Sequence, residues 1–206
     1  MMNKFPLLII VFSFLTVATN AQQFRAGLFA GVSATQLSGD ELGGFDKAGL
    51  AAGGMVSTTL SNKFDLSMEI LYIMKGSRDN ANTAKGDYTS YLCRLSYFEV
   101  PIMFQWLYSK RFTFEAGPTF GALLNEYEED ELGEIPNRRP FNKFELGIAG
   151  GMKVHFAQKF SFTSRIETSV LPVREHESGE TYYFNKGQYN AVIVFGIQYT
   201  FKKNNE

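Results

Sequence analysis

Apolar and polar residues alternate with a period of two over most of the chain from residue 24 onward. The pattern is clearest from Gln188 to Phe201, where every odd-numbered position is apolar or aromatic and the even-numbered positions are mixed, small or polar. Such alternation places successive side chains on opposite faces of a β-strand. Together with seven further segments it predicts eight strands, at about residues 24–37, 48–60, 64–75, 91–108, 112–122, 144–156, 160–170 and 188–201.

The connections between these segments alternate in length. Short turns are expected near residues 61–63, 109–111 and 157–159, and long loops near 38–47, 77–90, 125–141 and 172–187. Each short turn carries a basic residue and is followed by Phe, a polar residue and another apolar one. An even number of strands joined in this way predicts an antiparallel up-and-down meander, with the short turns and both termini at one end.

Period two alone does not say whether the apolar face meets a protein core or lipid. A soluble barrel points its apolar face inward, whereas an outer-membrane barrel points it outward. Three features favour the outward orientation. The polar faces are rich in Gly, Ser and Thr with little charge, the apolar faces are continuous and end in aromatics, and the long loops are strongly polar. We therefore expect an all-β fold, an eight-stranded antiparallel transmembrane β-barrel whose closure leaves no unpaired edge in lipid.

The first 21 residues have the features of a secretory signal peptide. Lys4 supplies a positive charge, Phe5 to Val17 form an apolar stretch, and Thr19-Asn20-Ala21 fits a cleavage site. The apolar stretch is shorter than the ~20 residues of a membrane-spanning helix. Residues 1–21 are therefore predicted to direct export, and residues 22–206 to form the barrel domain in the bacterial outer membrane.

Composition removes several other classes of function. Twenty basic and 21 acidic residues give a net charge of −1, which provides no reason to expect nucleic-acid binding. The single cysteine, Cys93, excludes an intrachain disulfide framework and a cysteine-based zinc site. We expect no cofactor, metal or catalytic residue, and the predicted partners are outer-membrane lipid and envelope or secretion proteins that contact the long loops.

Short motifs spread along the whole mature chain carry a resemblance to a known family. They are Asn20-Ala21-Gln22, Ala26-Gly27-Leu28, Tyr97-Phe98-Glu99-Val100-Pro101-Ile102, Phe114-Glu115-Ala116-Gly117-Pro118 and Phe195-Gly196-Ile197-Gln198-Tyr199. The chain resembles the small outer-membrane β-barrels of the PorT-like family from Bacteroidetes. This resemblance implies residence in the outer membrane, and the namesake of the family implies a link to protein secretion.

The inward faces of the predicted barrel carry charged residues that form a candidate site. A barrel of eight strands has an interior just wide enough for side chains to fill, so these residues are expected to form a polar network in the lumen. The network consists of Glu69, Glu99, Glu115, Glu145, Lys153, Arg165 and Glu167, with Arg94 added if its side chain points inward. We interpret the network as a structural plug; the alternative is a binding or proton-relay site.

The favoured function is a non-enzymatic, structural or accessory role in the cell envelope, with support of protein secretion as its specific form. One alternative is a soluble periplasmic, lipocalin-like barrel that binds an apolar ligand. Another is a barrel enzyme with a site at its rim, for which His155 and His176 are the available histidines. The acidic run from Glu126 to Glu134 lacks the order of a calcium-binding loop, and Arg138 and Arg139 are positioned to neutralise part of it.

Overall fold

The computed structural model describes residues 24–39, 44–81, 84, 86, 88–136, 138–175 and 187–201. The predicted signal peptide lies outside these residues. Within the described part the regular structure consists of strands, with these bounds: β1 (Phe24–Ser38), β2 (Lys47–Ser61), β3 (Phe64–Asp79), β4 (Tyr91–Leu107), β5 (Phe112–Asp130), β6 (Gly133–Glu134), β7 (Phe144–His155), β8 (Phe160–Ser169) and β9 (Tyr189–Thr200). None of the described segments forms a helix long and apolar enough to cross a membrane.

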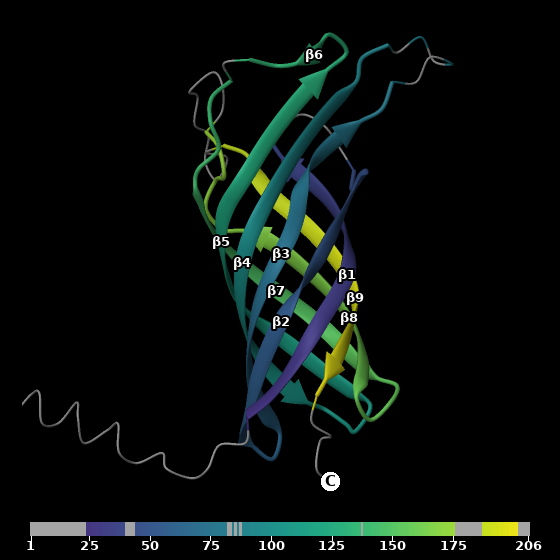
Figure 1. The fold of residues 1–206 in the computed structure, drawn as a ribbon, viewed down its shortest axis with the longest axis vertical. Coiled ribbons are helices and arrows are strands. Elements are labelled where there is room, and N and C mark those ends of the chain that lie inside the picture. Colours follow the sequence, from purple (N-terminus) through teal and green to yellow (C-terminus); the bar gives the residue numbers. More distant parts are fainter. Residues whose placement is uncertain are drawn as a thin grey trace, which may run out of the picture.

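The eight long strands close into a barrel, as the sequence pattern predicts (Figure 1). Each strand pairs in antiparallel fashion with the preceding and following long strand, and β1 closes the barrel by pairing with β9 from Gly27↔Thr200 to Ser38↔Tyr189. The two-residue β6 pairs only with the end of β5 and adds no strand to the barrel wall. Because closure leaves no free sheet edge, the backbone amides and carbonyls of the wall have partners without water.

The predicted strand positions are confirmed except at the long-loop end. There, β5 runs to Asp130, eight residues beyond the predicted end at 122, and β3 runs to Asp79, beyond the predicted end at 75. β4 pairs with β5 as far as Tyr91↔Asp130, so the backbone ladder continues where the outward side chains are no longer apolar. The prediction of a loop from 125 was wrong because alternation reports contact with lipid, which ends before the pairing does. Figure 1 shows β5 continuing towards β6 at this end.

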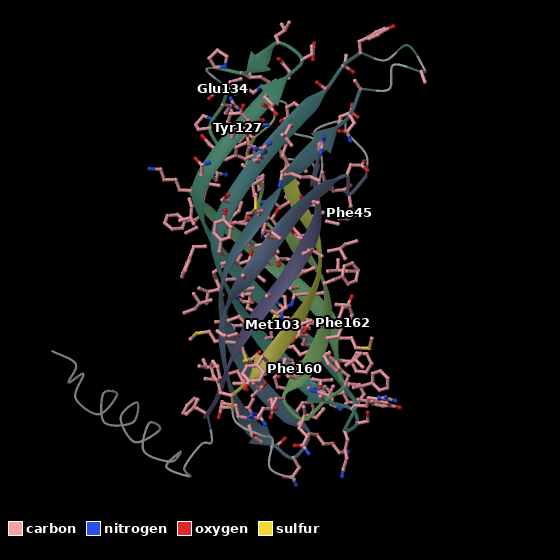
Figure 2. All side chains as sticks on the ribbon, turned by 45° about the vertical axis from the view of Figure 1, so that its right-hand side comes forward. Phe45, Met103, Tyr127, Glu134, Phe160 and Phe162 are labelled. Atoms are coloured by element: carbon pink, nitrogen blue, oxygen red, sulfur yellow. The ribbon has the colours of Figure 1, made fainter. Side chains whose placement is uncertain are left out.

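Apolar side chains cover the outside of the barrel, and charged side chains fill much of the inside (Figure 2). Large hydrophobic residues with substantial exposure include Leu28, Val32, Leu50, Met68, Ile70, Phe98, Phe104, Trp106, Phe120, Ile148, Ile166, Phe195 and Ile197. Buried charged residues include Lys75, Glu69, Glu99, Glu115, Glu145, Lys153, Arg165 and Glu167. This distribution is the inverse of a lipocalin-like soluble barrel, and it matches a barrel that has lipid as its outer solvent.

Aromatic residues border the apolar surface. Near the short turns, the ring of Trp106 lies 5.4 Å from that of Tyr108, and the ring of Phe160 lies 5.0 Å from that of Tyr199. Tyr72 follows eight residues after the start of β3 and is 43% exposed. Eight residues rise about 27 Å along a strand, or roughly 20 Å in height at the usual barrel tilt. The height from the start of β3, beside a short turn, to the aromatic ring of Tyr72 is therefore close to the ~25 Å apolar band of outer-membrane barrels.

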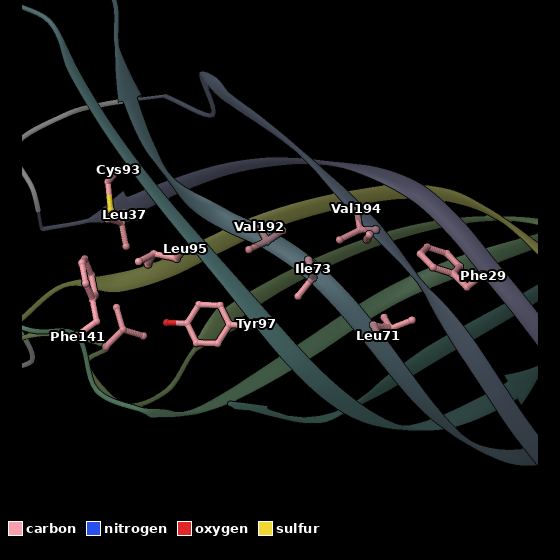
Figure 3. Close-up of a cluster of buried hydrophobic side chains, with 12 residues drawn as sticks. Phe29, Leu37, Leu71, Ile73, Cys93, Leu95, Tyr97, Phe141, Val192 and Val194 are labelled. Carbon is pink, nitrogen blue, oxygen red and sulfur yellow. The ribbon is translucent and has the colours of Figure 1, made fainter. Parts of the chain in front are cut away.

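An apolar cluster that the sequence pattern did not predict extends through the lumen from the long-loop end past its middle (Figure 3). The cluster contains Phe29, Leu37, Ala51, Leu71, Ile73, Cys93, Leu95, Tyr97, Phe141, Val173, Val192 and Val194. Phe141 and Val173 belong to loops rather than strands, and they fold over the lumen. The apolar cluster therefore alternates with charged residues along the lumen: on β3, Lys75 lies nearer the long-loop end than Leu71 and Ile73 do.

Candidate functional site: two charged clusters in the lumen

Four charged residues meet in the half of the lumen nearer the short turns, and we call them the Arg165 cluster: Glu69, Glu115, Lys153 and Arg165. The guanidinium of Arg165 donates to both carboxylate oxygens of Glu69, at 3.0 and 2.8 Å, and twice to Oε1 of Glu115, at 3.1 and 2.8 Å. Lys153 Nζ lies 3.0 Å from Glu115 Oε2. All four side chains are at most 2% exposed.

A glycine on the neighbouring strand gives Arg165 its position. Gly151 of β7 lies opposite Arg165 of β8, and a Cβ atom at Gly151 would lie 2.4 Å from the Ser164 carbonyl oxygen. The same Cβ would lie 3.2 Å from the Arg165 Cβ. The absence of a side chain therefore lets β8 pack close to β7 and leaves room for the guanidinium to cross the lumen to β3 and β5.

A second group surrounds Lys75 and is called the Lys75 cluster: Lys75, Glu99, Glu145 and Glu167. Lys75 Nζ lies 2.5 Å from Glu99 Oε2 and 3.1 Å from Glu145 Oε1, and it also contacts Glu167. The ammonium lies 5.3 Å from the centre of the Tyr97 ring. Each of these charged side chains is at most 1% exposed.

The two clusters differ in charge balance. The Arg165 cluster pairs two cations with two carboxylates, whereas the Lys75 cluster places three carboxylates around one ammonium. Asn190 Nδ2 donates to Glu145 Oε2 at 2.8 Å, and Glu99 Oε1 is buried without a hydrogen-bond partner within the described structure. Buried charges without partners are costly, so the Arg165 cluster is the better compensated of the two.

The structure places all seven predicted lumen residues inside the barrel, but it divides them between these two clusters. The condition for adding Arg94 to the network is not met: its side chain is exposed, and its guanidinium lies 5.7 Å from the centre of the Tyr127 ring. Lys75 is the central residue that the predicted network omitted. Lys75 lies on the same strand face as Glu69, and this was a usable signal. On that face, however, Leu71 and Ile73 lie between Glu69 and Lys75 and interrupt the polar pattern.

The two ends of the lumen are unlike each other. At the short-turn end a cavity of about 80 Å³ opens, and its wall includes Arg25, Asp65, Gln105, Lys153, His155 and Gln198. At the long-loop end, the apolar side chains of Phe141 and Val173 close the interior. The open part of the lumen therefore begins at the short turns and ends at the Arg165 cluster, and the Lys75 cluster and the apolar cluster fill the interior beyond it.

Of the two histidines considered for a rim site, the described structure includes His155. His155 Nε2 lies 2.9 Å from Thr113 Oγ1, which is a hydroxyl rather than a carboxylate partner. His176 lies outside the described residues. Among the residues that the structure describes, no group of three or more His, Cys, Asp or Glu side chains has the arrangement of a metal site.

The comparison with the solved structure of Ail agrees with this architecture. Ail, the attachment invasion locus protein of Yersinia pestis, solved in complex with the heparin analogue sucrose octasulfate, is similar with 10% identity and a TM-score of 0.51. The match covers 87% of this chain and 99% of Ail. Neisserial surface protein A matches with 10% identity and a TM-score of 0.49, over 86% of this chain and 97% of that one. At these identities the similarity concerns the fold alone.

The family comparison concerns the sequence directly. A search of curated proteins found no match. A family model described as "Outer membrane protein beta-barrel domain" matches residues 20–204 and so covers nearly the whole chain. This match agrees with the outward apolar surface, the aromatic borders and the closed eight-stranded wall. The protein therefore belongs to the outer membrane protein β-barrel domain family and resides in the bacterial outer membrane.

Proposed function

We propose that the protein is a closed, non-enzymatic barrel with a structural or accessory role in the cell envelope. The observation that supports this proposal is the filling of the lumen by direct ion pairs. Arg165 crosses the interior to carboxylates on β3 and β5, and Lys153 binds a carboxylate on the neighbouring β5. Lys75 binds carboxylates on β4, β7 and β8. Side chains that bind one another across the lumen in this way act as a plug, so the functional surface is expected at the loops.

The absence of transport through the lumen is testable by electrical recording. The purified protein is inserted into planar lipid bilayers, and current is measured across a voltage range with an open porin as the positive control. Because side chains fill an eight-stranded lumen, we expect insertion without stepwise conductance. Regular conductance steps from correctly folded protein would contradict the plug and would replace the structural role by a transport role.

The role of the loops is testable by site-specific photo-crosslinking in cells. A photoreactive residue at Leu132, which is 91% exposed beyond the end of β5, samples partners at the outer surface. The matched control is the same residue at Leu28, an exposed apolar position of the barrel wall. We expect protein adducts specific to position 132. The same adducts at both positions, or none at position 132, would contradict an accessory role mediated by this loop.

The resemblance to PorT-like proteins supports a more specific form of the proposal, in which the accessory role serves protein secretion in a member of the Bacteroidetes. Its test is deletion of the gene followed by quantification of proteins in the culture medium and at the cell surface. We expect secreted proteins to accumulate in the periplasm of the deletion strain and to be released again on complementation. Unchanged secretion would remove the secretion role while leaving the structural role intact.

A further inference from the structure

The exposed charges of the barrel differ in sign between its two ends. At the short turns, the exposed charged residues that the structure describes are all basic: Lys63, Lys110, Arg111 and Lys159. Asp65, the acidic residue described at this end, is buried and paired with Arg25. The long-loop end instead carries exposed carboxylates, among them Glu126, Glu131 and Glu134. The short-turn rim therefore has a positive charge that the described part of the chain does not balance.

Two of the short turns bring three of these cations to one side of the rim. The turn between β2 and β3 carries Lys63, and the turn between β4 and β5 carries Lys110 and Arg111. The turns are neighbours because β3 pairs with β4, and the Leu107 amide donates to the Lys63 carbonyl at 2.8 Å. We call this group of basic residues the turn patch: Lys63, Lys110 and Arg111.

The cations of the turn patch are exposed, and within the described residues none of them forms an ion pair with a carboxylate. The turn that carries two of them is fixed by its own hydrogen bonds. The Ser109 hydroxyl accepts from the backbone amides of Arg111, at 3.3 Å, and Phe112, at 3.0 Å. Lys110 and Arg111 are therefore held at the rim, with their charges directed to the surroundings of the barrel.

Three exposed aromatic rings flank the turn patch on the outer surface. The ring centres of Trp106, Tyr108 and Phe114 are separated pairwise by 5.4, 5.9 and 6.0 Å. They lie on both sides of the turn between β4 and β5. Aromatic side chains concentrate where a membrane meets water, at the level of the lipid headgroups. The rings therefore place the turn patch at the depth of the headgroup phosphates.

We propose that the turn patch binds the phosphate group of an anionic phospholipid, with the three rings packed against its acyl chains. A guanidinium forms parallel hydrogen bonds to phosphate oxygens, and an ammonium adds a compact positive charge. A zwitterionic lipid brings its own cation, which the turn patch repels, whereas an anionic lipid brings a net negative charge. A lipid is favoured over a soluble acidic protein because the rings place the patch at the membrane surface. This inference does not rest on the proposed function.

The test uses Trp106, the single tryptophan of the chain, as a reporter beside the turn patch. The folded protein is reconstituted into phosphatidylcholine vesicles that contain a minor fraction of phosphatidylglycerol. In one sample the phosphatidylglycerol carries bromine on its acyl chains, and in the other an equal amount of the phosphatidylcholine does. Bromine quenches tryptophan fluorescence at short range, so the quenching measures which lipid lies beside Trp106.

We expect brominated phosphatidylglycerol to quench Trp106 more strongly than the same amount of brominated phosphatidylcholine. The excess quenching should decrease as salt is raised, because salt screens exposed charges. Lys110→Gln and Arg111→Gln should each lower the relative affinity for phosphatidylglycerol by about fivefold, the effect of one basic residue near an anionic membrane surface. Lys110→Arg retains the charge and should behave like the wild type.

Arg94→Gln is the matched control, since Arg94 is an exposed arginine beside an aromatic ring, at the opposite end of β4 from Trp106. We expect the wild-type lipid preference in this variant, and a heat-dependent mobility shift on gels verifies that every variant is folded. Equal quenching by the two brominated lipids in the wild type would overturn the proposal. An unchanged preference in the double variant Lys110→Gln with Arg111→Gln would also overturn it. So would an equal loss in Arg94→Gln, because the preference would then reflect the overall charge of the protein.

Discussion

Replacing Arg165 by Met tests whether the charged lumen stabilises the barrel. The substitution removes four hydrogen bonds to Glu69 and Glu115 and leaves Lys153 as the cation for two buried carboxylates. The Arg165 cluster thereby changes from neutral to a charge of −1. Removing one partner of a buried ion pair typically costs about 3–5 kcal/mol. We expect a loss of this size in the free energy of unfolding, which is a large fraction of the ~5–15 kcal/mol of an ordinary domain.

Two further variants separate charge imbalance from lost packing. The double substitution Arg165→Met with Glu69→Gln leaves Lys153 and Glu115, which lie 3.0 Å apart, as a balanced pair. Because balanced replacement of buried ions is often nearly neutral, we expect the double variant to be more stable than Arg165→Met alone. Arg94→Met makes the same chemical change at an exposed position and should alter stability by less than about 0.5 kcal/mol.

The assay is urea unfolding of the protein from lipid vesicles, followed by the fluorescence of its single tryptophan. Trp106 is 44% exposed on the apolar outer surface, so unfolding transfers its ring from lipid to water and shifts its emission. The reasoning is refuted if Arg165→Met is no less stable than Arg94→Met. It is equally refuted if the double variant is less stable than the single one, since charge balance would then not govern the cluster.

Further predictions concern the second cluster, the lipid surface and the interior. Lys75→Met should destabilise the barrel strongly because it leaves only carboxylates in its cluster, whereas Glu99→Gln should be neutral or stabilising; equal losses in urea unfolding would contradict this difference. Ile70→Arg should cost about 2–4 kcal/mol if this side chain faces the middle of the bilayer, while Leu132→Arg should cost almost nothing; similar unfolding curves would refute the assigned surface. Cys93 should react with maleimide only after unfolding, because it is fully buried, and rapid labelling of the folded protein would contradict its place in the interior.

The wall of the barrel was predictable from the sequence because contact with lipid imposes a strict pattern. Alternate residues such as Phe98 and Phe104 meet lipid, and alternate residues such as Glu99 do not, so the strands and their orientation could be deduced. The extension of β5 to Asp130 was not predictable in this way. Beyond the lipid, backbone pairing with β4 maintains the strand, and no apolar alternation is required.

The lumen was predictable in content but not in arrangement. Strand alternation shows that Glu69 and Arg165 share the interior, but the pairing of residues 96 positions apart depends on barrel closure and on the stagger of the strands. The division into two clusters follows from the same geometry. At the outer rim, Arg138 and Arg174 lie in loops and contact Glu128, and no periodic signal in the sequence predicts these contacts.

The most direct test of the inverted barrel is to measure which solvent the outward side chains meet. Spin labels are placed singly at Ile70, Phe98, Ile148 and Phe195, on four different strands, in a Cys93→Ser background and in lipid vesicles. Their collision rates are measured with oxygen, which dissolves in lipid, and with a water-soluble nickel complex. We predict that oxygen collisions dominate at all four positions. Dominant collisions with the nickel complex would show that these faces meet water and would contradict the membrane-embedded barrel.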